Sequence, residues 1–220
     1  MLWAENLASI ESEGRRLIEA VRRDPMRPVP QYPGWTLADL ATHTAGIHAR
    51  TVEIVTALPE ERIPVPALAD GADPIVWYEE TLGAMLAALQ GADPAQACWG
   101  FGPAPCVGTW ETRMVAETGV HRWDAYQAFG EEDRLTDRVA LIGLEEFPDV
   151  WLPRLGAVQT LDVTATDLGR SFVYGGPEPS AHVEGTASDI YLRLMSRPSP
   201  VELPDDWAAA LDGLAPPPKS

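Results

Sequence analysis

Apolar residues recur at every third or fourth position through four long segments of the chain. This spacing places them on one face of an α-helix, so each segment predicts a helix. The predicted helices cover about 3–23, 37–57, 74–90 and 110–129. Thr36, Asp73 and Thr109 stand just before the last three segments, where capping residues are preferred. Four helices joined by moderate loops predict an up-down-up-down bundle, in which the second and fourth helices run parallel.

The pattern changes after the fourth helix. A further helix is predicted at about 136–147, ended by Pro148. The segments VQTLDVTATD, RSFVYG and AHVEG then alternate apolar and polar positions, as half-buried strands do, and DIYLRLMSR and DDWAAALDGL predict two short helices. We therefore expect an α+β protein, with a helical bundle over residues 1–150 and a small α+β domain over residues 151–220.

Composition and charge narrow the classes of partner. The chain has 220 residues, of which 45% are hydrophobic and 22% charged, and this is typical of a globular protein. Its net charge of −17 argues against nucleic acid or an anionic membrane as a partner, because both bind basic patches. No apolar run is long enough to cross a bilayer, and MLWAENLASIESEG lacks the features of a signal peptide. We expect a cytoplasmic monomer, with a dimer as the alternative.

The fourth predicted helix carries a second line of polar residues between apolar neighbours. Glu117 and His121 are one turn apart on this line, so their side chains lie next to each other. A buried charge is unfavourable unless it is paired or bound to a metal, and a carboxylate and an imidazole are two ligands of a divalent metal site. Taken alone, however, the E-x-x-x-H spacing is more often an ordinary helical pair.

His43 is the candidate for a third ligand. It lies on the apolar stripe of the second helix, about seven residues from its start, and Glu117 lies about as far into the fourth. In a bundle with these two helices parallel, both would lie at nearly the same depth, near the end where the helices begin. Two histidines and one glutamate leave the fourth position of tetrahedral zinc open, as in catalytic sites. Asp39 and Asp124 could hold the imidazoles as outer acceptors; a helix-start acid and an interhelical acid are the alternatives.

Two motifs in these helices, and a third fragment, resemble a known family. They are W-T-x-x-D-L-x-x-H at 35–43, E-T-x-V-H-R-W-D-A at 117–125 and GTASDIYLRLMSR at 185–197. They are similar to the mycothiol-dependent maleylpyruvate isomerase family of the DinB-like superfamily, and together they cover nearly the whole chain. The resemblance implies a DinB-like four-helix bundle and a divalent metal, usually zinc, held by His43, Glu117 and His121. It also implies mycothiol as the thiol cosubstrate.

The resemblance leaves the reaction open. A thiol bound to zinc is deprotonated and becomes a nucleophile at neutral pH. It could add reversibly to an activated double bond, as in a maleylpyruvate-type cis–trans isomerisation, or attack an electrophile and stay attached, which is S-transfer. We favour the broader transferase description. A metal-dependent hydrolase that uses metal-bound water and a non-enzymatic, metal-stabilised small-molecule binding protein are the alternatives.

An acidic substrate would need an arginine to hold it. Arg113 is the preferred candidate because it lies one turn from Glu117, although a salt bridge to Glu117 or Asp124 is its alternative role. Arg50 and Arg197 are further candidates.

Aromatic residues could bind the sugar-bearing part of mycothiol. Trp110, together with Trp35, Trp99 and Phe101, is expected at the end of the bundle where the second and fourth helices begin. Capping of the core is the equally weighted alternative for these side chains. His48 and His182 have no partner in the pattern, and both are expected at the surface.

Overall fold

The computed structural model describes residues 2–131, 133–215 and 217, and these form two compact units. One unit runs to Asp133 and includes Pro217, and the other begins at Arg134. The first is helical and the second combines helices with a small sheet, which confirms the expected α+β class. No helix among the described residues is long and apolar enough to cross a membrane.

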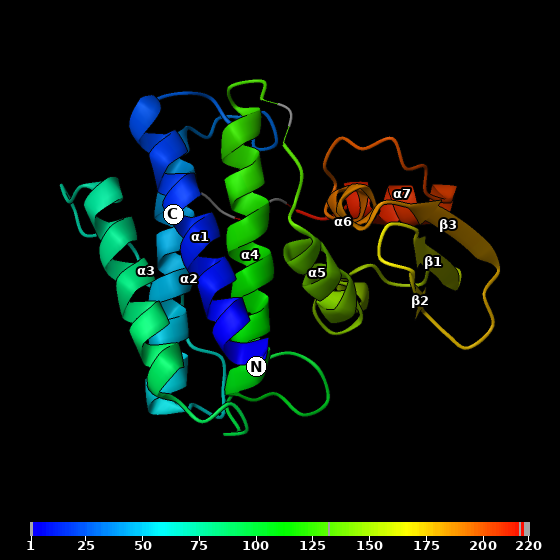
Figure 1. Cartoon of the computed structure of the whole chain (residues 1–220), viewed down its shortest axis with the longest axis horizontal. Helices are drawn as coiled ribbons and strands as arrows, with labels where there is room; N and C mark the ends of the chain where they lie inside the picture. Colours follow the sequence, from blue (N-terminus) through cyan, green and yellow to red (C-terminus); the bar gives the residue numbers. More distant parts are fainter. Residues whose placement is uncertain (1, 132, 216, 218–220) are drawn as a thin grey trace. The chain divides into compact units, whose positions relative to one another are not determined.

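Four long helices form the first unit (Figure 1). They are α1 (Leu2–Arg23), α2 (Leu37–Ala57), α3 (Pro74–Gly91) and α4 (Val107–Gln127). The predicted caps of α2 and α3 are confirmed, since Thr36 accepts a bond from the backbone N–H of Asp39 and Asp73 accepts from two backbone N–H groups of α3. Helix α4 begins three residues earlier than expected, with Cys106 at the N-cap. Thr109 lies in the first turn, where its hydroxyl accepts from the N–H of Cys106 (3.2 Å).

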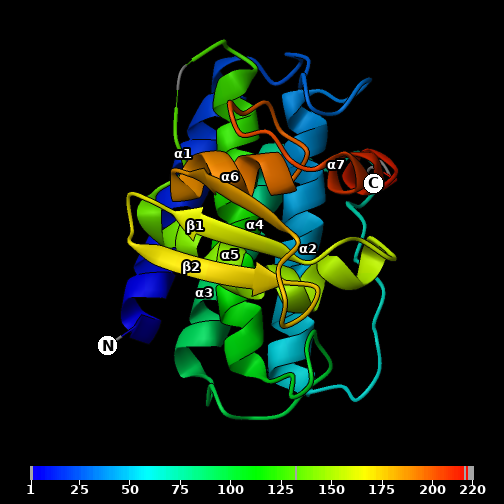
Figure 2. The same cartoon turned by 90° about the vertical axis from the view of Figure 1, so that its right-hand side faces the viewer.

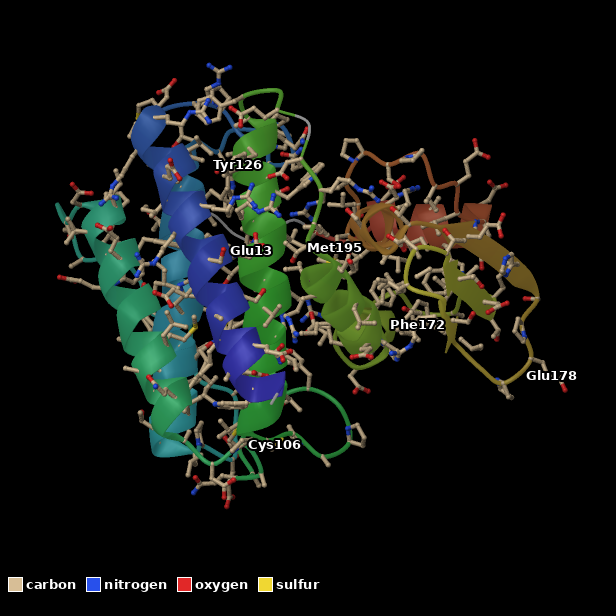
Figure 3. All side chains as sticks on the ribbon, in the orientation of Figure 1. Glu13, Cys106, Tyr126, Phe172, Glu178 and Met195 are labelled. Carbon is tan, nitrogen blue, oxygen red and sulfur yellow. The ribbon has the colours of Figure 1, made fainter. Side chains whose placement is uncertain are left out.

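Helices α1 and α4 run parallel and are joined by buried polar contacts. Asn6 Nδ2 donates to Glu111 Oε2 (3.0 Å) near the first turns of both helices. Further along both, Arg122 Nε donates to Glu13 Oε2 (2.5 Å), and Figure 3 labels Glu13 where α1 lies beside α4. Arg122 is fully buried, and its guanidinium also contacts the carboxylate of Asp133, so that a charge which would be costly in an apolar core is paired on two sides.

The expected up-down-up-down order was wrong, because α2 and α4 run antiparallel. The backbone N–H of Trp99, in the loop before α4, donates to the carbonyl of Pro59, just after α2 (2.6 Å). The carbonyl of Trp99 accepts from Nε1 of Trp110 in the first turn of α4 (2.6 Å), so the end of one helix meets the start of the other. Figures 1 and 2 show that α2 and α3 run in the same direction, which makes the order up-down-down-up. The connection over 58–73 permits this, because at about 3.3 Å per residue it can run back along the whole length of α2.

The second unit packs three helices and a short 3₁₀ turn with a three-stranded sheet (Figure 2). Its elements are α5 (Asp137–Val150), η1 (Leu152–Arg154), β1 (Leu161–Ala165), β2 (Arg170–Tyr174), β3 (Ala181–Gly185), α6 (Ala187–Leu194) and α7 (Asp205–Asp212). The strand order is β2-β1-β3, with β1 antiparallel to β2 and parallel to β3. Helix α5 continues through Pro148 instead of ending before it; proline has no N–H to donate to the carbonyl of Leu144, and the hydroxyl of Tyr174 donates to that carbonyl instead.

Helix α5 packs within the second unit, against α6 and the sheet. The Tyr174 hydroxyl of β2 donates to the carbonyl of Leu144 (2.8 Å), and the Tyr174 ring lies 5.3 Å from that of Phe147. The compact units therefore divide at residues 133–134, whereas the sequence suggested a domain boundary at residue 150. The boundary at residue 150 stays a prediction.

A line of polar side chains connects the four helices inside the first unit. His48 of α2 is fully buried, and its Nε2 lies 3.1 Å from the hydroxyl of Thr118 on α4. Its ring lies 5.4 Å from that of Tyr78 on α3, and the Tyr78 hydroxyl donates to the carbonyl of Gly14 on α1 (3.2 Å). The expectation that His48 lies at the surface was wrong. The sequence pattern showed no partner for His48, because its partner Thr118 lies on another helix and comes close only in the packed bundle. His182 is exposed, as expected.

We expect Gly143→Ala to destabilise the second unit. A Cβ atom at this position of α5 would lie 2.2 Å from ring atoms of the buried Tyr191 on α6, so the two helices would have to move apart. Overpacking of this kind lowers the free energy of unfolding by about 1–3 kcal/mol, and calorimetry of thermal unfolding would measure it. Gly83→Ala is the matched control, because nothing lies within 4 Å of the corresponding Cβ on α3. An equal loss of stability in both variants would contradict this account of the α5–α6 contact.

We expect His48 to make the fold less stable in acid. Burial lowers the pKa of His48 to about 3 from its ordinary value of 6.5. Between these values the unfolded chain binds the proton and the folded chain does not, so the contribution of His48 is complete above pH 6.5 and is lost as the pH falls toward 3. The slope is at most about 1.4 kcal/mol per pH unit.

Denaturant unfolding of the metal-free protein at several pH values, compared with His48→Leu, measures this contribution. The variant lacks the titrating group, whereas Glu117, His43 and His121, which act electrostatically on His48, are present in both proteins. The pH dependence of unfolding should therefore be weaker in the variant between pH 6.5 and 3. Identical slopes in the two proteins would show that His48 is protonated in the folded state.

Candidate metal centre

The three residues expected to bind a metal lie together in the first unit. The nearest ligand atoms of His43 on α2 and of Glu117 and His121 on α4 are all within 4.8 Å of one another. Glu117 Oε1 lies 3.5 Å from His43 Nε2 and 3.2 Å from His121 Nε2. The two imidazole rings are 5.3 Å apart and nearly perpendicular, at 88°. Two nitrogen donors thus converge on one carboxylate oxygen.

The antiparallel packing of α2 and α4 brings these residues to one level. His43 is near the start of α2, and it meets residues in the second half of α4. Further along α2, Thr51 donates to the sulfur of Met114, which comes earlier on α4 (3.3 Å). Residue numbers therefore rise along one helix as they fall along the other. The three residues expected from the sequence lie together although the expected helix direction was wrong, because Glu117 is at the middle of α4, where reversing the helix changes its level little.

Electrostatics favours an ionised Glu117. Burial by itself would raise the pKa of Glu117, but the nearby Arg113 and His121 outweigh it and hold the pKa well below its usual range. Burial would likewise lower the pKa of His121, but Glu117 and then Asp124 outweigh it, so the pKa is raised. Without a metal, this cluster therefore holds a carboxylate next to an imidazole that gains a proton easily, and a metal ion would compete with that proton.

Each oxygen of the Glu117 carboxylate has a separate role in the packing. Oε1 faces the two histidines, and Oε2 contacts the guanidinium of Arg113, one turn earlier on α4. The salt bridge that the sequence analysis gave as the alternative role of Arg113 is therefore present. Its position fixes the carboxylate so that Oε1 is directed at the imidazoles.

Asp124 and Asp39 lie in different environments. Asp124 is fully buried, and its Oδ2 lies 3.0 Å from His121 Nδ1. Since a carboxylate only accepts, Nδ1 carries the proton and Nε2 is left to face Glu117. Asp39 accepts from both the N–H and the hydroxyl of Thr36, each at 2.8 Å, as a helix-start acid does. The role of Asp39 as an acceptor for His43 stays a prediction.

The loop over residues 28–35 covers the cluster with aromatic rings. Trp35 lies 5.3 Å from the His43 ring, and Tyr32 lies 6.0 Å from the His121 ring. The two aromatic rings stack on each other at 4.8 Å, and both side chains are buried. Tyr32 was not among the expected site residues, because a loop residue gives no periodic signal and only the fold of the loop brings it to the helix.

The expectation that a second aromatic loop lies at the same end of the bundle was wrong. Trp99 and Phe101 precede α4, and their rings lie within 5.7 Å of each other and of Trp110. The guanidinium of Arg50 lies over the rings of Trp99 and Trp110, at 5.6 Å and 5.4 Å. Because α2 and α4 are antiparallel, this group lies at the end where α2 stops, away from the loop that covers His43.

Arg197 lies in the second unit. It is buried, and its Nη1 donates to the carbonyl of Met195 (2.5 Å).

The donor set suits a divalent metal. Tetrahedral zinc with ligand bonds of about 2.0–2.2 Å needs its donors roughly 3.3 Å apart, and the two separations from Glu117 Oε1 are close to that value. Two imidazoles and one carboxylate leave one position for an exogenous ligand. The bond from Asp124 to the far nitrogen of His121 is the outer contact that metal-binding histidines usually have.

Comparison with known proteins identifies the family. A family model described as the mycothiol maleylpyruvate isomerase N-terminal domain matches residues 7–126, which is more than half of the chain. No curated protein matches significantly.

Two similar solved structures are a mycothiol-dependent maleylpyruvate isomerase and a histidine-to-alanine mutant of such an enzyme. They have TM-scores of 0.66 and 0.69 and 13% identity, and each alignment covers 92% of this chain and 95% of the other. At that identity the likeness shows the shared fold. The family model carries the assignment: this chain belongs to the mycothiol maleylpyruvate isomerase family.

Proposed function

We propose that this protein is a metal-dependent enzyme that uses mycothiol as a cosubstrate and acts on a small electrophile. The observation that carries the proposal is the convergence of His43, Glu117 and His121 in a chain of this family. A divalent ion held there, most simply zinc, would lower the pKa of a thiol bound at its open position, so that the sulfur could react as a thiolate. The similar solved structures are described as mycothiol-dependent isomerases, which agrees with this chemistry.

The residues of the chain would prepare the site in three ways. Asp124 holds the proton on Nδ1 of His121, so that Nε2 can bind a metal. Arg113 holds one oxygen of Glu117 and leaves the other toward the imidazoles. The rings of Tyr32 and Trp35 exclude water from one side, and this strengthens the electrostatic interactions within the cluster.

The reaction we propose is addition of the thiol to an activated carbon. In an isomerisation, a carbon–sulfur bond forms at a double bond, the remaining single bond rotates, and loss of the thiol restores the double bond in the other geometry. In an S-transfer, the carbon–sulfur bond is kept: either the other carbon of the former double bond takes up a proton, or the sulfur displaces a leaving group that departs with its bonding electron pair. The covered cluster suits both reactions, and maleylpyruvate-type substrates fit the family.

We keep Arg113, Arg50, Trp110 and Arg197 as proposed substrate-binding residues. The contact of Arg113 with Glu117 gives it a second role in orienting the carboxylate. Arg50 and Trp110 form one cation–aromatic group, so they would act together on one part of a substrate or of mycothiol. A cytoplasmic location and a monomeric state, with a dimer as the alternative, stay predictions.

We expect the purified protein to bind about one zinc or similar divalent ion per chain. His121→Ala should lose the ion, because it removes a nitrogen donor and leaves Glu117 without its nearest imidazole. His182→Ala is the matched control, since that histidine is exposed on the second unit. Elemental analysis after reconstitution and dialysis measures the content. Equal metal contents in the two variants would show that the wrong three residues have been assigned.

We expect turnover to require the thiol. Maleylpyruvate and a panel of small electrophiles would be incubated with the metal-loaded protein, with and without mycothiol, and products and adducts followed by mass spectrometry. Conversion or adduct formation should occur only with the thiol, because the proposed nucleophile is its sulfur. Conversion of a substrate by the loaded protein without any thiol would favour a hydrolase that uses bound water.

A further inference from the structure

His48 makes one of the few polar contacts between α2 and α4. Its Nε2 lies 3.1 Å from Thr118 Oγ1, and Thr118 is the residue after the carboxylate that His43 faces. This contact lies between the His43–Glu117 contact on one side and the Thr51–Met114 contact on the other. The three contacts define the alignment of the two helices.

An imidazole is an unfavourable choice for this position if only stability counts. His48 is fully buried, and its Nδ1 has no hydrogen-bond partner among the described residues. Leaving such a group unsatisfied in the core costs about 1–3 kcal/mol. An apolar side chain of similar size would avoid that cost. Buried polar groups in helix bundles are often kept because they define one alignment of the helices.

The alignment of α4 on α2 matters because the Glu117 carboxylate faces His43 only over a narrow range of helix positions. Successive residues of a helix differ by about 100° in direction and 1.5 Å in height, so a small rotation or slide of α4 would turn the carboxylate away from His43. Apolar contacts oppose such a shift only weakly, since they are non-directional. A hydrogen bond between α2 and Thr118, the residue after Glu117, opposes the shift, because the bond breaks when α4 moves by more than a few tenths of an ångström.

We propose that His48 is a positioning residue: its hydrogen bond to Thr118 sets the alignment of α4 on α2 and thereby directs Glu117 Oε1 at His43 and His121. The residue does not touch a metal or a substrate, and it acts through Thr118. The proposal concerns the metal-free protein first. Its consequence for metal binding rests on the function proposed above.

The first experiment uses the metal-free protein. Long-range ¹H–¹⁵N spectra report the imidazole nitrogens, and the chain has 4 histidines, so the signals are few. In His48→Leu and in Thr118→Val, the nitrogen signals of His43 and His121 should shift, because their contact with Glu117 is altered. His48→Gln and Thr118→Ser keep a hydrogen-bonding group and should restore the wild-type signals.

The matched control is Thr44→Val. Thr44 is fully buried on α2, one turn before His48, but its hydroxyl donates to the carbonyl of Leu40 within its own helix (2.9 Å). Its loss should leave the signals of His43 and His121 unchanged. Unfolding of the metal-free variants supplies the second comparison: at pH 7, the double variant His48→Leu/Thr118→Val should be at least as stable as wild type, because it removes both hydrogen-bonding side chains and leaves neither of them unpaired.

The second experiment measures Co²⁺ affinity by competition with a chelator. We expect His48→Leu and Thr118→Val each to weaken binding about tenfold or more, as loss of outer contacts does, and the double variant to be no weaker than either single variant. A loss of affinity without a loss of stability separates positioning from general support of the fold.

The outcomes decide the two proposals separately. Unchanged signals of His43 and His121 in His48→Leu, or a failure of His48→Gln to restore shifted ones, would overturn the positioning role whatever the metal does. If wild type binds no Co²⁺ while the signals shift as described, the metal-dependent function fails and the positioning role stands. Shifted signals with full Co²⁺ affinity in His48→Leu would overturn the link between alignment and binding.

Discussion

The buried carboxylate of Glu117 is the constraint on which the helical unit depends. A charge in the core is tolerated only when opposite charge or hydrogen-bond donors surround it. Arg113 takes one oxygen, and His43 and His121 approach the other. These partners come from two helices, so α2 and α4 must pack at one particular level. The same requirement that makes the core stable therefore assembles the donor set of the candidate metal centre.

Polar contacts recur through the bundle, although apolar side chains at the same positions would often give an equal or larger free energy of unfolding. Buried Glu13 and Arg122, with the partly buried Asp133, form a second charge group between α1 and the end of α4. His48 and Thr118 form a neutral contact between α2 and α4. Such groups add little net stability, but they penalise every misaligned packing, because each misalignment leaves a buried polar atom unpaired. The bundle thus combines a non-directional apolar core with a few directional contacts that select one arrangement.

Most of the helices and strands could be predicted from residues close together in the sequence. Apolar periodicity and capping residues located the four helices, and period-two alternation located the strands, because both signals depend on residues close in sequence. The order of the helices was not predictable in the same way. The connection over 58–73 is long enough for either direction of α3, so its length does not decide between the two topologies. Packing along the bundle decided it, as the contact between Pro59 and Trp99 shows.

The same distinction between local sequence and packing applies to the candidate site. The sequence by itself determined which residue types could bind a metal, since one helical turn separates Glu117 from His121 and His43 lies on the inward stripe of α2. Only the tertiary structure decided that Tyr32 covers the cluster, that Arg113 is engaged with Glu117, and that Arg50 packs over Trp110. Periodicity reports which face a residue occupies, but contacts between helices depend on direction and relative height, and these are properties of the packed chain.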